Sequence, residues 1–206
     1  MKNNKTLQYI LIGASLIALP LILQIFGNAW VRIADMALLY ILLAIGLNIV
    51  VGYAGLLDLG YVAFFAVGAY MYGLLSSPHL TSTFTSIAAM FPEGMHMPIW
   101  LIVPVGAGLA GLFGMLLGAP TLKLRGDYLA IVTLGFGEII RVFMNNLDHP
   151  VNITNGPKGL DQIDSISIFG LNLGKKLMIG DFEIASVSLY YYLFLSLVLV
   201  AILISH

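Results

Sequence analysis

Long apolar runs recur along this chain, and no other feature limits its possible folds as strongly. A helix needs about 20 mostly apolar residues to cross the hydrocarbon core of a bilayer. Only 9% of the 206 residues are charged and 60% are hydrophobic, whereas a soluble domain carries about a quarter charged residues. The sequence therefore predicts an all-α fold, a polytopic integral membrane bundle of about six helices in a single transmembrane domain over residues 1–206. The predicted spans are residues 7–26, 33–51, 56–75, 98–120, 128–146 and 187–205.

The positions of lysine and arginine predict the orientation of these helices. Basic residues accumulate in short cytoplasmic loops, and Lys2 and Lys5 precede the first apolar run. This places the N-terminus in the cytoplasm, and six alternating spans then put Lys123 and Arg125 on the same side. Both ends of the chain are therefore predicted to be cytoplasmic. Because His206 follows the last apolar run without a basic flank, we also expect a truncated chain.

Two polar segments separate apolar runs on the other side of the membrane. Residues 76–97 contain no lysine or arginine, and we expect a loop there with a short interfacial helix over residues 85–91. Residues 147–186 hold eight of the 19 charged residues, which are nine basic and ten acidic in all. They also contain the turn-forming sequence Asn155-Gly156-Pro157. This composition predicts a long extracytoplasmic loop that can fold back over one mouth of the bundle.

The composition also excludes several classes of function. A net charge of −1 gives no basic surface for nucleic acid, and the lack of cysteine excludes disulfides and thiolate metal sites. The histidines have no partners at metal-ligand spacing, so we interpret all four as solvated and expect no metal or other cofactor; they are His79, His96, His149 and His206. No nucleophile or acid–base motif occurs, so the sequence does not predict an enzyme.

Small residues recur on one face of the fourth predicted span. Gly106, Gly108 and Gly111 fit a dinucleotide-binding pattern, but they lie within an apolar helix rather than after a strand. Ala110, Gly114 and Gly118 follow one another at four-residue spacing. Such a face lets two helix backbones approach closely inside a membrane. We therefore predict that it packs against another helix rather than against lipid.

Glu138 and Arg141 are charged residues inside the fifth predicted span. They lie three residues apart and so share one helix face. Glu138 is about 15 Å along the helix from Tyr128, near the middle of a bilayer. A lone charge there costs about 3 kcal/mol on insertion scales, so the two side chains are predicted to face the protein interior and to neutralise each other or a nearby polar group such as Asn145. The pair either fixes the rotation of the helix or lines or gates a transport pathway.

A glycine-rich break follows the second predicted span. Asn48 and Asp58 flank residues 52–60, which carry no basic residue although they are expected to form a cytoplasmic turn. Broken helices with polar side chains also form binding sites in transporters. The segment is therefore either an interfacial turn or a broken helix inside the protein. Arg32 and Asp35 near the start of this span are interpreted as a solvated pair.

Two stretches resemble the branched-chain amino-acid ABC transporter permeases, most closely the second of the two paired permeases of leucine/isoleucine/valine uptake. The first stretch runs from Gly46 to Tyr61 and continues to Tyr70, and the second runs from Leu124 to Arg141. A third segment from Ile153 to Leu160 resembles that family's Thr-Gly-Gly-Pro-x-Gly turn, with Asn155 in place of a glycine. The chain ends before the cytoplasmic ATPase-docking helix of such permeases, which puts its own coupling to ATP in doubt.

The resemblance implies a permease subunit of an importer in the inner membrane of a bacterium. The implied partners are a second permease subunit, cytoplasmic ABC ATPase subunits and a periplasmic amino-acid-binding protein. Asn48, Asp58, Glu138, Arg141 and Asn145 are the candidate pathway or gating residues. Two alternatives stay open, namely a permease for another small polar solute and a membrane scaffold without transport.

Overall fold

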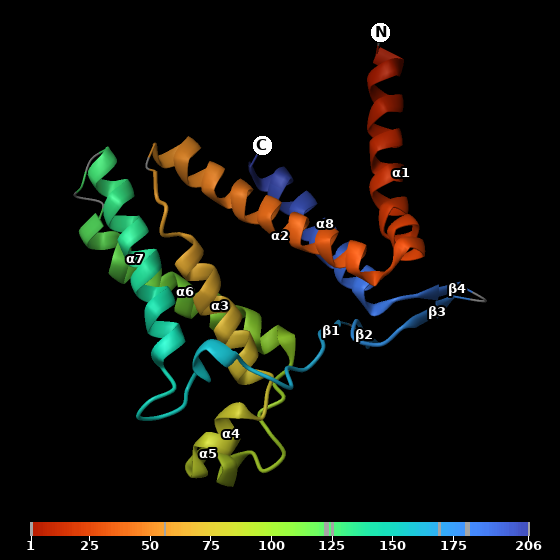
Figure 1. Cartoon of the computed structure of the whole chain (residues 1–206). Helices are drawn as coiled ribbons and strands as arrows, with labels where there is room; N and C mark the ends of the chain where they lie inside the picture. Colours follow the sequence, from red (N-terminus) through yellow and green to blue (C-terminus); the bar gives the residue numbers. More distant parts are fainter. Residues whose placement is uncertain are drawn as a thin grey trace. The chain divides into compact units, whose positions relative to one another are not determined.

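The computed structural model describes residues 2–55, 57–121, 124, 126–168, 170–179 and 182–205 (Figure 1). The chain divides into two compact units, one formed by residues 1–46 and 168–206 and the other by residues 47–167. Helices α1 (Lys2–Phe26) and α8 (Ser186–Ser205) and most of α2 (Asn28–Ile49) belong to the first unit. The second unit is built around α3 (Val62–Leu75), α6 (Ile99–Thr121) and α7 (Asp127–Asn146).

The long helices coincide with the predicted spans. Within the described residues, four segments are long and apolar enough to cross a membrane, namely Asn28–Tyr53, Ile99–Leu116, Tyr128–Asn146 and Ser186–Ser205. Two shorter apolar helices, Leu11–Phe26 and Val62–Leu75, correspond to the first and third predicted spans. The polytopic membrane fold is therefore confirmed, whereas the number of six spans and the cytoplasmic location of both ends stay predictions. Lys123, Arg125 and His206, used in predicting that topology, lie outside the described residues.

The start of the third predicted span is wrong. Helix α2 continues as a π-helix, η1 (Val50–Ala54), and ends at Gly55, whose φ of 64° is left-handed. The next helix begins only at Val62, so the predicted start at residue 56 precedes it by a non-helical segment. Glycine readily adopts a left-handed conformation and thereby ends a helix. The segment between the two helices is the stretch for which the sequence allowed either an interfacial turn or a broken helix.

The first unit has a core of large side chains. Val31 and Leu38 of α2 pack with Tyr191, Leu195 and Val198 of α8, and all of them are buried. Smaller contributions come from α1, where Leu16 and Leu23 pack against this cluster. Many apolar side chains of these helices are nevertheless exposed, as expected for spans that face lipid.

Pro20 lies in the middle of α1 and depends on α8. Proline has no N–H group, so the carbonyl oxygen four residues earlier, on Leu16, loses its helical hydrogen bond. The Tyr191 hydroxyl donates to this oxygen at 3.2 Å, and the Pro20 side chain is fully buried. The proline is therefore accommodated by a partner on a neighbouring helix, as an apolar environment requires.

The second unit packs its helices through glycine. A Cβ atom placed on Gly60, just before α3, would lie 2.4 Å from the carbonyl oxygen of Thr133 in α7. On α6, a Cβ atom on Gly114 would lie 4.0 Å from the ring of Phe64 in α3. The prediction that the small-residue face of α6 packs against another helix is therefore confirmed at Gly114. Figure 1 shows α3 running alongside α6 and α7.

The polar segments contain short elements that the sequence did not predict in full. Between α3 and α6 lie two short helices, α4 (His79–Thr83) and α5 (Thr85–Met90), and the second of them matches the helix expected over residues 85–91. The predicted long loop holds a 3-10 turn, η2 (Gly156–Lys158), and four strands. The strands form two sheets of two, in which β1 (Ser167–Ile168) pairs with β2 (Leu171–Asn172) and β3 (Leu177–Ile179) pairs antiparallel with β4 (Phe182–Ile184). These hairpins are the exception to the all-α prediction.

Candidate functional site

The break before α3 is fixed by side-chain hydrogen bonds. The Gly60 amide donates to Asp58 Oδ1 at 2.8 Å, so the carboxylate closes a tight turn over its own backbone. The Leu59 amide donates to Thr133 Oγ1 at 3.0 Å, and this hydroxyl donates in turn to the carbonyl of Ala130 at 3.2 Å. Thr133 is only 4% exposed. The break is therefore a defined structure held against α7.

A small cavity of about 70 Å³ opens beside this break. Asp58 and Thr133 give it polar groups, and the rings of Phe64 and Phe136 give it apolar walls. Gly60, Gly114 and Gly118 complete its lining, so the glycines of α6 leave the space that side chains would fill. The non-helical backbone of the break both packs on α7 and lines this cavity, which are the two settings that would allow it within a membrane.

The predicted ion pair on α7 is present. Arg141 Nη1 lies 3.0 Å from Glu138 Oε1 and 3.2 Å from Oε2. The side chains of Arg141 and Glu138 expose 71% and 59% of their surface. Pairing lowers the cost of both charges inside a span, but this chain alone does not bury them.

Glu138, Arg141 and Asn145 line one groove between α3 and α7, with a volume of about 420 Å³. The rest of its lining is mostly apolar and comprises Leu59, Val62, Ala63, Ala66, Tyr70, Leu134, Gly137, Ile140 and Met144. Small-molecule sites in proteins have volumes of about 300–1,000 Å³ and combine apolar walls with a few polar groups. The groove therefore has the size and the chemistry of a site for a small amphiphilic solute.

The other two predicted pathway residues lie apart from this groove. Asp58 lines the small cavity at the break, whereas Leu59 and Val62 of the same segment line the groove. Asn48 lies near the end of α2, before the π-helix, and lines neither recess. Thr133, which the sequence gave no reason to select, connects the break to the helix that carries Glu138 and Arg141.

Two sequence interpretations of polar residues are wrong. Asp35 is half-buried, and its Oδ1 atom is enclosed without a hydrogen-bond partner among the described residues. It lies one helical turn from Val31 and Leu38, on the α2 face that packs against α8, and is therefore not simply solvated. The histidines are not all solvated either. His79 Nε2 is enclosed without a partner in the described part of the chain, so the interpretation is wrong for this residue. The side chains of His96 and His149 are 45% and 88% exposed, as expected, and they also contact carboxylates, at 2.6 Å from Asp164 Oδ2 and 3.2 Å from Asp148 Oδ1.

Apolar helices long enough to span a bilayer, a non-helical break before one helix and an ion pair along an open groove are features of membrane transport proteins. The family model described as "branched-chain amino acid transport system / permease component" matches residues 29–206. The chain belongs to this family of permeases.

Two curated relatives carry the same printed description. The chain is 41% identical over 153 residues to the high-affinity branched-chain amino acid transport system permease protein LivM of Escherichia coli (strain K12). It is also 41% identical over 153 residues to the LivM protein of Salmonella typhimurium (strain LT2). Each alignment covers 74% of this chain and 32% of the relative, so it spans about a third of the relatives' length. No solved structure matches the chain significantly.

Proposed function

We propose that this chain forms part of the transmembrane permease subunit of an ABC importer for branched-chain amino acids. The observation that carries the proposal is the groove between α3 and α7, in which an apolar wall adjoins a paired carboxylate and guanidinium. Membership of the permease family supports the same function. The proposal makes the protein a transporter rather than an enzyme.

The chemistry of the groove fits an aliphatic amino acid. Such a solute is a zwitterion at neutral pH, with an ammonium and a carboxylate on one carbon and an apolar side chain beside them. Arg141 can bind the carboxylate of the solute in a bidentate manner. Glu138 can accept hydrogen bonds from its ammonium group, and Asn145 can donate or accept one further hydrogen bond. Leu134, Ile140 and Met144 would then contact the branched side chain. The solute would replace the direct contact between Glu138 and Arg141, so the charges stay compensated.

The proposed partners account for the exposure of the groove. A second permease subunit packed over α3 and α7 would bury the pair and close the pathway. Separate cytoplasmic ATPase subunits would hydrolyse ATP, and a periplasmic binding protein would deliver the solute. In this arrangement the chain crosses the inner membrane of a bacterium six times, with both ends cytoplasmic and residues 147–186 outside. The break between Asn48 and Val62 would let α3 move during alternating access.

Uptake of labelled leucine tests this function. The host cells lack their own branched-chain permease, and they express the whole permease that contains this chain, together with its partner subunits. Glu138→Gln and Arg141→Met should each abolish uptake, and the double variant should assemble but stay inactive because it cannot bind a zwitterion. Recovery of uptake in the double variant would show that the pair is only structural.

A matched pair outside the groove provides the control. Lys176 and Glu183 form an ion pair within the hairpin region, and they do not line the groove. The double variant Lys176→Met with Glu183→Gln should therefore keep uptake. The proposed substrate class is wrong if the permease does not take up leucine, or if it takes up other small polar solutes equally well.

Reporter fusions test the proposed orientation. A reporter that is active only outside the cytoplasm should be active when fused near Gly94 or Gly170, because both positions lie in the predicted extracytoplasmic segments. It should be silent near residue 125. The opposite pattern would overturn the orientation.

A further inference from the structure

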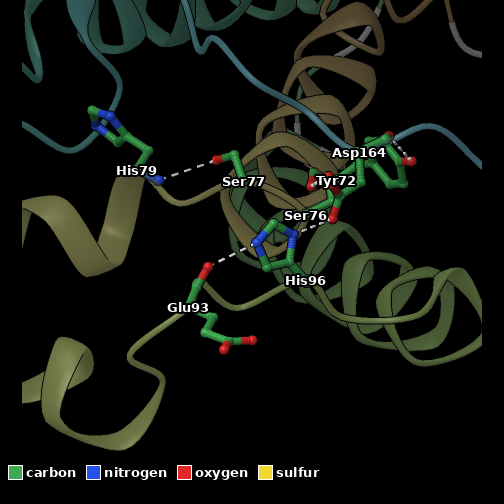
Figure 2. A network of polar contacts seen from close by, with 7 residues as sticks. All are labelled: Tyr72, Ser76, Ser77, His79, Glu93, His96 and Asp164. Carbon is green, nitrogen blue, oxygen red and sulfur yellow. Dashed lines mark hydrogen bonds and ion pairs between the residues drawn. The ribbon is translucent and has the colours of Figure 1, made fainter.

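The ring of His96 joins two loops that are far apart in the sequence. His96 lies in the segment that connects α3 to α6, whereas Asp164 lies in the segment that follows α7. His96 Nδ1 is 2.6 Å from Asp164 Oδ2, and His96 Nε2 is 2.9 Å from the carbonyl oxygen of Glu93 (Figure 2). Both loops belong to the second compact unit.

The chemistry of these two partners determines the charge of the ring. An ionised carboxylate and a backbone carbonyl only accept hydrogen bonds. A neutral imidazole carries one N–H and one lone pair, so it can satisfy only one of the two oxygens. The doubly protonated imidazolium donates to both. Both contacts can therefore be hydrogen bonds to acceptors only when His96 is charged.

Asp164 is anchored independently of the histidine. Its amide donates to the carbonyl oxygen of Ser76 at 2.9 Å, and its own carbonyl oxygen accepts from the Tyr72 hydroxyl at 2.9 Å. Ser76 is 1% exposed and Ser77 is fully buried. The backbone of Asp164 is thus fastened to the end of α3, and its carboxylate presents a fixed target to the ring.

The backbone around His96 is shaped to bring the ring to this target. His96 has a φ of 37°, a left-handed value that non-glycine residues rarely adopt. Gly94 has a φ of 115°, and a Cβ atom there would lie 2.5 Å from His96 Nε2. Side chains other than hydrogen at position 94 would therefore displace the ring. A conformation of this kind persists only when its surroundings stabilise it. Here the contacts of the ring with Asp164 and with the Glu93 carbonyl provide that stabilisation.

We propose that His96 is a pH-sensitive clasp that fastens the segment at residues 91–98 to Asp164, whose backbone is already held at the end of α3. When protonated, the ring bridges the Glu93 carbonyl and the Asp164 carboxylate and holds this segment in place. When it loses a proton, one ring nitrogen presents a lone pair to an oxygen, and the bridge opens. The clasp is independent of the solute that the groove takes.

The electrostatic surroundings of the ring set the direction of the response. The hydrogen bond to Asp164, the bond to the Glu93 carbonyl and the negative charges of both residues raise the pKa of His96 above 6.5, and slight burial opposes them. The network in Figure 2 contains two other titratable groups, Tyr72, whose hydroxyl donates to the Asp164 carbonyl, and His79, whose amide donates to Ser77. A raised pKa in the folded state stabilises it below the ordinary pKa, and that stabilisation disappears as the pH rises through the raised value. The clasp is therefore closed in acid and open in alkali.

Spin-label distances test the clasp directly. These 206 residues contain no cysteine, so cysteines introduced at the exposed positions Met90 and Asp161 would be their only labelling sites, one on each loop. In the complete permease in lipid nanodiscs, the distance distribution between the two labels should be narrow at about pH 5.5 and broad at about pH 8.5, on either side of the ordinary histidine pKa. His96→Gln should give the broad distribution at both pH values.

Another histidine of the second unit provides the matched control. His149 pairs with Asp148, which is adjacent in the sequence, so this pair does not bridge the two loops. His149→Gln should therefore keep the full pH response. A distribution that does not change with pH, or a response that survives in His96→Gln, would overturn the proposal.

A second measurement does not depend on whether His96→Gln folds. The protonation of His96 can be followed by NMR with ¹³C-labelled histidine in the otherwise unaltered chain. Its midpoint should lie above 6.5 and should fall toward this ordinary value in Asp164→Asn. A midpoint at or below 6.5 in the unaltered chain would equally overturn the clasp.

Discussion

The two compact units of this chain hold their helices together by opposite means. In the first unit, α2 and α8 are joined by large buried side chains, with Tyr191 only 1% exposed at the centre. In the second unit, α3 meets α6 and α7 where side chains are absent, at Gly60 and Gly114. Apolar side chains gain little from leaving lipid, so helix association in membranes depends on close packing and hydrogen bonds. The first unit meets this requirement with large buried side chains, and the second unit meets it with glycines that let the helices approach closely.

This difference in packing corresponds to a difference in what each unit can do. In the first unit, large apolar side chains fill the space between α2 and α8, and Tyr191 completes the hydrogen bonding that Pro20 removes from α1. The glycines of the second unit leave room for a non-helical segment, a cavity and a groove with charged residues. We infer that the first unit is the scaffold and that the second unit carries the solute pathway.

Removing volume should damage the first unit most. Tyr191→Ala deletes the largest fully buried side chain and leaves a cavity, which for aromatic residues typically costs about 3–5 kcal/mol of unfolding free energy. Tyr192→Ala is the matched control on the adjacent residue, which is only partly buried. Reversible unfolding in mixed micelles should show a clearly larger loss for Tyr191→Ala. Equal losses would contradict the assignment of Tyr191 to the core.

Adding volume should damage the second unit. Gly60→Ala places a methyl group within 2.4 Å of a backbone oxygen on α7, and overpacking of this kind costs about 1–3 kcal/mol. Gly68→Ala, within α3, meets no atom within 4 Å and should be tolerated or mildly stabilising. Thermal unfolding of both variants in nanodiscs makes the comparison. If Gly60→Ala is as stable as Gly68→Ala, close packing at the break is refuted.

The hydrogen bond from the Tyr191 hydroxyl to the Leu16 carbonyl tests whether α8 must compensate for Pro20 in α1. Tyr191→Phe removes the hydroxyl that bonds the free carbonyl of Leu16, and an unsatisfied buried group costs about 1–3 kcal/mol. Pro20→Ala restores the helical donor, so the same substitution should cost less in that background. A double-mutant cycle measures the coupling. Additive effects would show that Tyr191 does not compensate for the proline.

The hydroxyl of Thr133 should give the smallest of these effects. Thr133→Val keeps the shape but removes the acceptor for the Leu59 amide, with a cost of about 1 kcal/mol. Thr133→Ser retains the hydroxyl and should preserve the protection of the Leu59 amide in hydrogen exchange. Loss of protection in the serine variant as well would mean that the methyl group, not the hydrogen bond, fixes the break.

Much of the fold could be predicted from hydropathy because membrane spans are long and uniform. The helices at Ile99–Thr121, Asp127–Asn146 and Ser186–Ser205 begin and end within a residue or so of the predicted limits. The start of α3 could not be predicted, because Leu56, Leu57 and Leu59 continue the apolar run on either side of Asp58. What ends α2 is the left-handed Gly55, which is a local backbone property. The strands of two or three residues are too short for an alternating pattern to show.

The candidate site was predictable only where its parts are close in the sequence. Glu138 and Arg141 lie one helical turn apart, and their pairing followed from that spacing. The contact between Leu59 and Thr133 spans 74 residues, and the contact between His96 and Asp164 spans 68. No local pattern reports such contacts, so the cavity, the groove and the clasp became apparent only in three dimensions.

The most direct test of the account measures whether the groove between α3 and α7 binds the solute. Single cysteines at Ile140, which lines the groove, and at Ile139, which faces away from it, are introduced into the cysteine-free chain. Labelling by a water-soluble thiol reagent is followed in the assembled permease with and without leucine. The account predicts that the cysteine at position 140 is labelled and that leucine slows this labelling, whereas leucine has no effect at position 139. Labelling at position 140 that leucine does not slow, or equal slowing at both positions, would contradict the account.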